Sequence, residues 1–345
     1  MKRKPTLLLL VSLFAVQLAA QPRITFHPDE ANEKIDIWYD DHQFTSYSFA
    51  ERMRKVTFYP ITTPSGNFVT RGFPYRPRAF EHADHPHQIG LCFIFGDVNG
   101  VDFWNNSYAR PVEDAWKYGT IRNKRIVAMQ EGVGEAVLAV ETEWVDYRNQ
   151  ILLTEEVTYR FSGTGDTRVI ERYGKLTAVK RDVEFKDNKE GLWFIRFDKA
   201  FEEPQEKPEM HTDAQGYVMP ERTVINDRSI GTMRNAEGDE KEAGTFSKPT
   251  RWLSNTTVSN GEKMTVVLFD HPHNTGYPAR AFSRGYGMMA LNNMGTQCYT
   301  PEAEPFYYKL PAGESVEFKH KFLLLWGRDA AGQEIEGHFN DFSRK

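Results

Sequence analysis

Residues 153–161 have the sequence Leu-Thr-Glu-Glu-Val-Thr-Tyr-Arg-Phe, in which nearly every second residue is apolar and polar residues stand between them. Side chains alternate between the two faces of a β-strand, so this pattern predicts a strand with one face buried and the other in water. The turn residues Ser-Gly-Thr-Gly-Asp follow directly at 162–166 and predict where the strand ends. The same combination of strand and turn recurs along the chain.

Six further runs are rich in strand-forming residues. They are Ile35–Tyr39, Val56–Tyr59, Val137–Val145, Leu192–Phe197, Met264–Phe269 and Val316–Leu325. Helical periodicity is weak and is confined to Ser46–Lys55 and Ala330–Phe342. Because so many strands with so few connecting helices cannot form a parallel α/β sheet, we predict an all-β fold, a large antiparallel β-sandwich.

Two stretches are too polar to belong to the core, Glu202–Asp213 and Asn235–Thr250, and we predict that both are surface loops. Strand patterning resumes on either side of them without a change of character. This continuity favours one domain over residues 21–345 rather than two domains.

The first 20 residues are typical of a signal peptide. Three basic residues at 2–4 precede the apolar stretch Leu7–Leu18, and the small pair Ala19-Ala20 follows. We therefore expect cleavage after Ala20 and a periplasmic or secreted protein without a lipid anchor. A membrane-spanning helix needs about 20 apolar residues. The longest later candidate is Phe322–Trp326, so we expect no membrane span in the mature chain.

The charge pattern argues against nucleic acid as a partner. The net charge is −5, and basic and acidic residues are interspersed over the whole chain. The two cysteines, Cys92 and Cys298, lie in a compartment that permits disulfides. Cys92 sits in the apolar run Leu91–Phe95, and two buried thiols are favoured over a bridge.

The densest polar segment is Asp84-His85-Pro86-His87, which leads into the apolar run Leu91–Phe95. A residue that precedes proline is restricted to extended conformations, so we expect His85 and His87 to point to one side, with Cα atoms roughly 7 Å apart. Two imidazoles that titrate near neutral pH can act as acid and base.

A hairpin is predicted next, because Asn99-Gly100 stands between apolar residues. It would keep Asp97, Asp102 and Trp104 near the histidine loop. Carboxylates, imidazoles and an indole in one region suit a sugar, whose hydroxyls need polar partners and whose ring face stacks on an aromatic side chain. The alternative is structural: Asp97 satisfies amides of the turn, and Asp102 and Trp104 simply pack.

A second Asp-His-Pro-His segment follows a predicted strand at Asp270–His273. If the two loops converge, His271 and His273 add two imidazoles to the same mouth of the sandwich. Just beyond lie Arg280, Arg284 and Tyr286. An arginine at this mouth would hold a carboxylate and would favour an acidic sugar such as a uronate. Each histidine has the alternative of binding only to backbone groups, and each arginine that of a solvated surface charge.

No cofactor motif stands out in the sequence. It has no Gly-rich phosphate loop, no G-x-S-x-G and no H-E-x-x-H. Two H-x-H sites without a third fixed ligand are a weak metal signal, so we expect no cofactor and keep a bound transition-metal ion as an alternative.

The chain resembles a bacterial family labelled "methane oxygenase PmoA" and otherwise treated as a domain of unknown function. The segments that carry the resemblance are Thr63–Gly66, Asp84–His87 with Gly90-Leu91, Gly96–Trp104, Phe269–Pro272 and Arg284–Gly287. The chain departs from the common pattern at Gln88 and Ile89, where many members have a further His and often Arg. The oxygenase label conflicts with the predicted absence of a mature membrane span.

The resemblance implies a large β-sandwich of the galactose-mutarotase-like class, shared with aldose epimerases and some polysaccharide lyases. It also implies a role in sugar degradation. Fold alone does not fix the reaction, because function depends on the site.

Three functional hypotheses follow. The first is an enzyme that acts on a sugar or oligosaccharide by proton transfer, through epimerisation, elimination, dehydration or hydrolysis. His85 and His87 would be acid and base, Asp84 or Asp97 would orient an imidazole, Arg284 would hold an anionic group and Trp104 would stack. The second is a non-catalytic carbohydrate-binding protein that uses the same mouth. The third is a metal-dependent oxidase or oxygenase.

Overall fold

The strand predicted at residues 153–161 lies within β9 (Ile151–Thr164) of the computed structural model, which describes residues 21–345. Its odd-numbered residues from Leu153 to Phe161 are buried, and the even-numbered residues between them are half-buried or exposed. Glu155 is the polar member of the buried set, and it forms an ion pair with Arg172 of the neighbouring strand. The predicted signal peptide lies outside the described residues.

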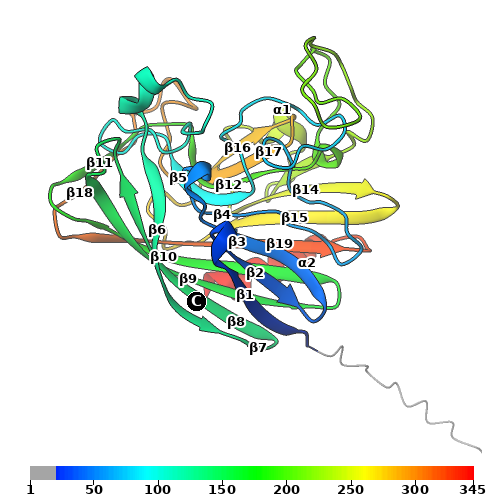
Figure 1. Cartoon of the computed structure of the whole chain (residues 1–345), viewed down its shortest axis with the longest axis horizontal. Helices are drawn as coiled ribbons and strands as arrows, with labels where there is room; N and C mark the ends of the chain where they lie inside the picture. The colour runs from blue at the N-terminus through cyan, green and yellow to red at the C-terminus, as the bar shows by residue number, and fades with distance from the viewer. Residues whose placement is uncertain (1–20) are drawn as a thin grey trace, which may run out of the picture.

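Within residues 21–345 the strands form two large antiparallel sheets and one small one (Figure 1). The nine-stranded sheet has the order β16 (Arg280–Arg284), β17 (Met288–Asn292), β12 (Gly191–Arg196), β5 (Leu91–Phe95), β4 (Thr57–Phe58), β3 (His42–Ser48), β2 (Lys34–Tyr39), β1 (Arg23–Asp29), β7 (Gly132–Val133). The eight-stranded sheet has the order β13 (Thr232–Asn235), β14 (Trp252–Ser259), β15 (Glu262–Asp270), β19 (Ser315–Trp326), β10 (Thr167–Ala178), β9, β8 (Glu135–Val145), β6 (Thr120–Gln130). The small sheet pairs β11 (Val183–Lys186) with β18 (Tyr307–Leu310). The predicted all-β antiparallel fold is confirmed.

Helices are few in the described chain. They are α1 (Lys241–Thr245), α2 (Gly332–Ser343) and the 3-10 turns η1 (Glu30–Asn32), η2 (Glu51–Met53), η3 (Val112–Lys117) and η4 (Lys199–Phe201). The helix expected at Ala330–Phe342 is confirmed as α2. The one considered at Ser46–Lys55 is wrong: β3 continues to Ser48 and only η2 follows. Tyr47 packs on Phe58 and Tyr159, and this tertiary packing outweighs a weak helical pattern.

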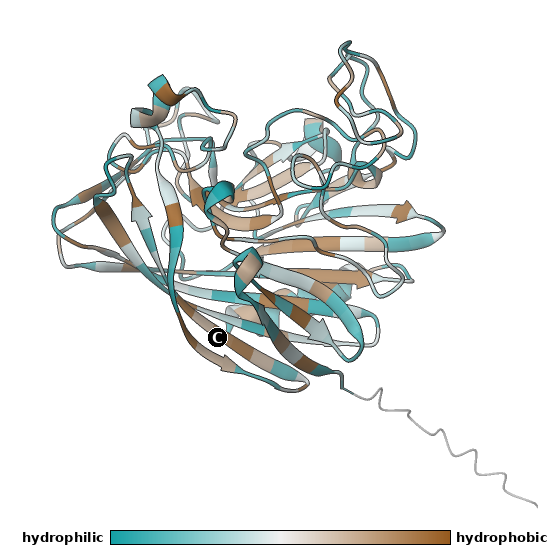
Figure 2. Ribbon diagram, in the orientation of Figure 1, coloured by the Kyte–Doolittle hydropathy of each residue, from teal (hydrophilic) through white to brown (hydrophobic). Residues whose placement is uncertain are grey.

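The core lies between the two large sheets. Phe93 of β5 contacts Trp144 of β8 and Phe318 of β19, which joins the inner faces of both sheets. A second cluster lies on the other face of the eight-stranded sheet, where Phe339 and Phe342 of α2 pack on β15 and β19. Figure 2 shows apolar residues alternating with polar ones along many strands, as two-faced sheets require.

The two polar stretches are less exposed than predicted. Glu202 is 1% exposed, and one of its carboxylate oxygens lies 2.8 Å from Nδ1 of His82. His211 and Thr212 are also buried. The second stretch contains α1 as well as loop. An ion pair therefore allows a polar segment to enter the interior.

Two further expectations concern the cysteines and a membrane-spanning helix. Cys92 is buried and Cys298 is exposed, and both are free thiols, so no bridge forms. Cys298 is therefore not the buried thiol that the sequence suggested. In the described part of the chain, no helix is long and apolar enough to cross a membrane.

Candidate functional site

The candidate site lies on the outer face of the nine-stranded sheet, over β12, β17 and β16, which lie side by side beneath the loops at the top of Figure 1. Side chains along β12 alternate: Trp193 stacks on His320 in the core, and Phe194 points to the opposite face. There Trp104 packs on Phe194 and on Phe282 of β16, with ring centroids 4.8 and 5.8 Å apart. These three rings form the floor beneath the histidine loop.

Arg71 holds the histidine loop in one conformation. Its guanidinium donates to the backbone carbonyls of His82, Asp84, His85 and Gln88 and to a carboxylate oxygen of Asp84. Arg71 is 1% exposed, so these bonds are shielded from water. The guanidinium of Arg71 thus fixes the loop from beneath.

His85 does not adopt the extended conformation predicted from Pro86. Its φ is +41°, in the left-handed region that non-glycine residues rarely occupy. The hydrogen bonds of Arg71 to the carbonyls on both sides of His85 account for this, because they over-determine a local conformation that would otherwise be strained.

Asp84 is shared between two guanidinium groups and one imidazole. Its Oδ1 accepts from Arg71 at 2.6 Å and from Arg196 at 2.8 Å, and its Oδ2 lies 2.7 Å from Nδ1 of His85. Burial would raise the pKa of Asp84, but Arg196, His85 and Arg71 together hold it well below its ordinary value. Asp84 is therefore ionised, and it accepts the Nδ1 proton of His85.

This pairing leaves Nε2 of His85 available. The His85 side chain is 44% exposed, and Nε2 makes no hydrogen bond to the described residues. Because Nδ1 carries the proton of the neutral ring, Nε2 has the free lone pair. The His85 ring stacks on Tyr286, with 5.4 Å between the ring centroids. The guanidinium of Arg196 also lies over the Tyr286 ring, 4.4 Å from its centroid. His85 thus has the geometry of a general base.

His87 lies beside His85 but in a different environment. The two rings meet edge to face at 5.5 Å, and His87 is 5% exposed. Burial, Lys55 and His85 lower the pKa of His87 well below 6.5. His87 is therefore neutral and cannot serve as an imidazolium acid at neutral pH, so only one of the two predicted histidines has the properties of an acid/base group that substrate can reach.

A pair of carboxylates, Asp102 and Glu190, borders the same floor. Sequence reasoning placed Asp102 near the histidine loop but did not single out Glu190. The amide nitrogen of Asn105 donates to Asp102 at 2.9 Å and to Glu190 at 2.6 Å. Burial and the charge of Asp102 raise the pKa of Glu190, and burial raises that of Asp102.

Glu190 precedes β12 without any motif that distinguishes it from a surface glutamate. The available signal was its position next to a predicted core strand. Lys55 ties the two sides of the site together: its ammonium donates to the carbonyls of Trp104 at 2.6 Å and of His87 at 3.2 Å. Burial lowers the pKa of Lys55 to about 8.

Two predicted members of the site have structural roles. Asp97 lies in the predicted hairpin turn, where Asn99 and Gly100 have φ of +54° and +79°, and its Oδ1 accepts from the Gly100 amide at 2.8 Å. It orients no histidine. Trp104 is 1% exposed because it lies beneath the loops, so its ring cannot stack on a sugar.

The second Asp-His-Pro-His segment does not join the first, and the predicted convergence is wrong. His271 is fully buried and packs on Phe342 of α2, 5.0 Å between centroids. His273 is exposed and donates its backbone amide to the His271 ring. The segment ends β15 in the eight-stranded sheet beneath α2, whereas Asp84–His87 precedes β5 in the other sheet.

The two arginines differ in position. Arg284 is half-buried over Phe282 and Phe246, with its guanidinium 3.2 Å from Glu242. Because Phe282 is part of the floor, Arg284 borders the site. Arg280 donates to the carbonyl of Ser247 and points away from His85 toward the α1 loop. Among the described residues, no group of three His, Cys, Asp or Glu side chains could hold a metal ion.

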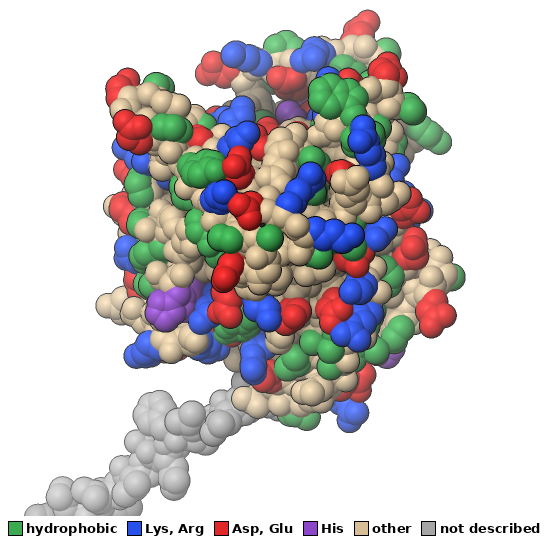
Figure 3. All heavy atoms as spheres, turned by 90° about the vertical axis from the view of Figure 1, so that its left-hand side faces the viewer, with side chains coloured by type: hydrophobic (Ala, Val, Ile, Leu, Met, Phe, Trp, Pro, Cys, Tyr) green, Lys and Arg blue, Asp and Glu red, His purple; other side chains and the backbone are tan. Residues whose placement is uncertain are grey.

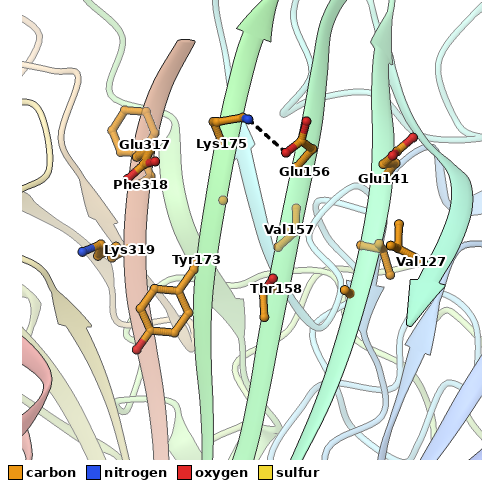
Figure 4. A pocket seen from close by; sticks show the side chains of 13 residues that line it. Val127, Glu141, Glu156, Val157, Thr158, Tyr173, Lys175, Glu317, Phe318 and Lys319 are labelled. Carbon is orange, nitrogen blue, oxygen red and sulfur yellow. Dashed lines mark ion pairs between the residues drawn. The ribbon is translucent and has the colours of Figure 1, made fainter. Parts of the chain in front are cut away.

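Depressions elsewhere on the surface lack this combination of groups. One of about 440 Å³ lies on the outer face of the eight-stranded sheet, where the Lys175–Glu156 ion pair and Tyr173 border Thr158 (Figure 4). Another, of about 700 Å³, lies between β14 and α2. Figure 3 shows acidic and basic side chains interspersed over one face of the molecule and a notch at the top in which a histidine is visible.

Comparison with known proteins places the chain in a family. A family model matches residues 34–340. The chain belongs to DUF6807, a family of unknown function. The description of DUF6807 gives no support to the "methane oxygenase PmoA" label. A search of curated proteins finds no match.

Several solved structures are similar to this DUF6807 member in part. The galactosidase domain of an α-galactosidase-sucrose kinase, AgaSK, has a TM-score of 0.39 and 12% identity over 88% of this chain and 42% of that chain. The GH36 α-galactosidase AgaB from Geobacillus stearothermophilus has a TM-score of 0.39 and 11% identity over 88% and 41%. A GalM/aldose epimerase homologue from C. elegans has a TM-score of 0.33 and 6% identity over 90% and 100%.

The chain thus spans about two fifths of the length of these α-galactosidases. All of these TM-scores are below 0.5, so the similarities do not indicate a reaction.

Proposed function

We propose that the protein is exported and acts on a sugar or oligosaccharide by proton transfer, with His85 as the base and Glu190 as the acid. The observation that carries this proposal is the Asp84–His85 pair, in which an ionised carboxylate 2.7 Å from Nδ1 leaves an exposed Nε2 free. A base must be within reach of its proton, and His85 is the histidine at this site that solvent reaches most freely.

The proton is conserved in this scheme. Nε2 of His85 takes a proton from a carbon or hydroxyl of the sugar, and Asp84 stabilises the imidazolium that results. Glu190, protonated in a larger fraction than an exposed glutamate because its pKa is raised, gives a proton to an oxygen on the other side of the substrate. In a β-elimination, the C–H bond next to a uronate carboxylate and the bond from the β-carbon to the leaving oxygen break and a C=C bond forms. Passage of the proton from His85 to Glu190 through water then resets the site.

Arg284 supports an acidic sugar as the substrate. Its guanidinium borders the floor through Phe282, and within the described chain Nε and Nη2 make no hydrogen bond. A uronate carboxylate would pair with these two donors. Withdrawal of charge by this pairing would make the adjacent C–H proton more acidic and easier for His85 to remove.

The test is a search for products across a panel of neutral and uronate-containing oligosaccharides, followed by mass spectrometry. We expect conversion by the wild-type protein. His85→Ala and Glu190→Gln should each slow it by on the order of 10²- to 10⁴-fold while binding changes little. Asp97→Asn, which alters a carboxylate in the hairpin turn outside the site, is the matched control and should keep the wild-type rate.

Binding without any product over the whole panel would instead identify a non-catalytic carbohydrate-binding protein. Conversion that survives His85→Ala unchanged would refute the assignment of the base. Export is tested separately, by N-terminal sequencing of protein from the cell envelope or medium: cleavage should leave Gln21 at the N-terminus.

A further inference from the structure

A depression of about 420 Å³ lies beside Asn106. The preceding residue, Asn105, is the one whose amide nitrogen donates to Asp102 and Glu190. The depression is bounded by the end of η2, by the segment from Asn106 to Thr120 that includes η3, and by the turn between β8 and β9. These three segments are far apart in the sequence, and none of them contributes a side chain to the reaction proposed above.

Two tyrosines at its border are unusually exposed. Tyr108 is 55% exposed and Tyr147 is 45% exposed, and they come from different walls of the depression. The guanidinium of Arg148 lies 5.0 Å from the Tyr147 ring centroid and donates to its hydroxyl, so a ligand would stack on the other face of that ring. An exposed aromatic ring with a polar tip suits a ligand that has both an apolar face and hydroxyl groups. A sugar ring has this combination.

Polar groups in the same walls have hydrogen-bonding capacity to spare. The hydroxyl of Ser107 is buried and has no partner among the described residues. Arg54 makes one ion pair, at 3.8 Å from Glu51, and its side chain is 39% exposed. Asn106 uses its amide nitrogen for Gly119 and Thr120, and its amide oxygen accepts no hydrogen bond within the described chain.

The charges of the lining balance. Arg54 and Arg110 are matched by Glu51 and Asp146. Asp146 already accepts the backbone amides of Arg148 and Gln150. A balanced lining favours a neutral ligand over an anionic one, in contrast to the side of the site where Arg284 lies.

One residue connects the depression to the site. Arg110 lines the depression and donates to the backbone carbonyl of Asn105 at 2.8 Å and to its side-chain oxygen at 3.1 Å. The amide nitrogen of the same Asn105 donates to Glu190. The side chain of Asn105 therefore contacts both Arg110, which lines the depression, and Glu190, the proposed acid.

We propose that this depression is a second sugar-binding subsite, which holds a neutral sugar unit of an oligosaccharide through stacking on Tyr108 and Tyr147. The proposal rests on the proposed function for the role of the neighbouring site. It identifies the substrate class as an oligosaccharide that extends past Asn105 rather than a free monosaccharide.

The test is binding to an array of neutral and uronate-containing oligosaccharides, with affinities of the best ligand measured by calorimetry. The Tyr108→Ala/Tyr147→Ala double variant should bind about tenfold or more weakly than the wild type. Tyr217→Ala is the matched control, because Tyr217 is a 73% exposed tyrosine outside the depression, and its variant should bind like the wild type. Thermal unfolding of each variant checks that the fold is intact.

Unchanged affinity in the double variant, or no binding of any oligosaccharide by the wild type, would overturn the subsite. His85→Ala separates this outcome from failure of the proposed chemistry, because it should abolish conversion and keep binding. If conversion is absent but the tyrosine variants lose affinity, the subsite stands and the proposed reaction does not.

Discussion

Asp84 combines roles that are usually spread over several residues. It neutralises part of the charge of Arg71 and Arg196, fixes the loop and orients His85. Because Arg71 and Arg196 are almost completely buried, removal of the carboxylate would leave two guanidinium groups without a full counter-charge. The chemistry and the stability of this loop therefore depend on the same side chain.

The Asp84→Asn variant tests this at the level of one residue. An amide no longer selects the His85 ring with the proton on Nδ1, so we expect ¹⁵N NMR to show that tautomer in the wild type and a mixture in the variant. We also expect loss of about 3 kcal/mol of unfolding free energy, the lower end for breaking a buried pair. A wild-type ring protonated at Nε2 would contradict the assignment.

Turns and loops carry the interactions that hold the elements together. Glu262, the first residue of β15, accepts hydrogen bonds at one carboxylate oxygen from Thr63 at 2.8 Å, Ser65 at 2.6 Å and Asn67 at 2.7 Å. The turn with the Thr-Pro-Ser-Gly sequence is thus attached to the β14–β15 hairpin. The segment that contributed to the family resemblance has a structural role.

We predict that Glu262→Ala lowers the free energy of unfolding by about 1–3 kcal/mol, because three donors lose a charged acceptor. Glu317→Ala is the control. Glu317 is an exposed glutamate of β19, the strand that pairs with β15, and its replacement should change the free energy of unfolding by less than about 0.5 kcal/mol. Urea denaturation of both variants measures the difference. Equal stability of the two variants would show that the attachment contributes nothing.

At the scale of elements, alternation predicted β9 because a strand with one buried face imposes period two on its own sequence. The same reasoning failed for His85 and for the second histidine segment. The φ of His85 depends on Arg71, which lies 14 residues earlier in the chain. The position of His271 depends on the packing of α2 against β15. Neither contact leaves a local pattern in the sequence.

The sequence predicted the polar loop of the site, but it did not predict which side chains from other segments lie beside that loop. Asp84 and His85 stand in a conspicuous tetrapeptide, and their pairing follows from adjacency. Glu190 and Asn105 come from segments that meet only when β5 and β12 pair. The burial of Trp104 likewise depends on the rings of Phe194 and Phe282. Long-range strand pairing therefore decides which side chains share the site.

At the scale of the molecule, buried histidines couple stability to pH. His87, His211, His271 and His320 all have a pKa below 6.5 because burial disfavours their charged form, and the pKa values of His211 and His271 fall to about 4. Below pH 6.5 the unfolded chain binds protons that the folded chain does not. The stability that these neutral histidines contribute is present above pH 6.5. It is lost as the pH falls toward their pKa values in the folded protein.

We therefore predict that the free energy of unfolding falls between pH 7 and pH 5, by up to about 1.4 kcal/mol per pH unit for each histidine. Asp270, whose pKa burial raises to about 6, acts in the opposite direction, and so do Asp102, Glu190 and Glu203, whose pKa values are also raised. The prediction is that the histidines outweigh these carboxyl groups. Urea titrations at several pH values measure the slope. His271→Phe should reduce it, and His42→Asn, at an exposed site, should not. A flat profile would contradict the prediction.

Chemical rescue can show whether the exposed imidazole of His85 carries out the proton transfer. Conversion of the best oligosaccharide substrate would be measured for His85→Gly with and without free imidazole. We expect the variant to be inactive and added imidazole to restore part of the rate, because the 44% exposed position of the His85 side chain leaves room for the free imidazole. Wild-type activity in His85→Gly without imidazole would contradict this expectation.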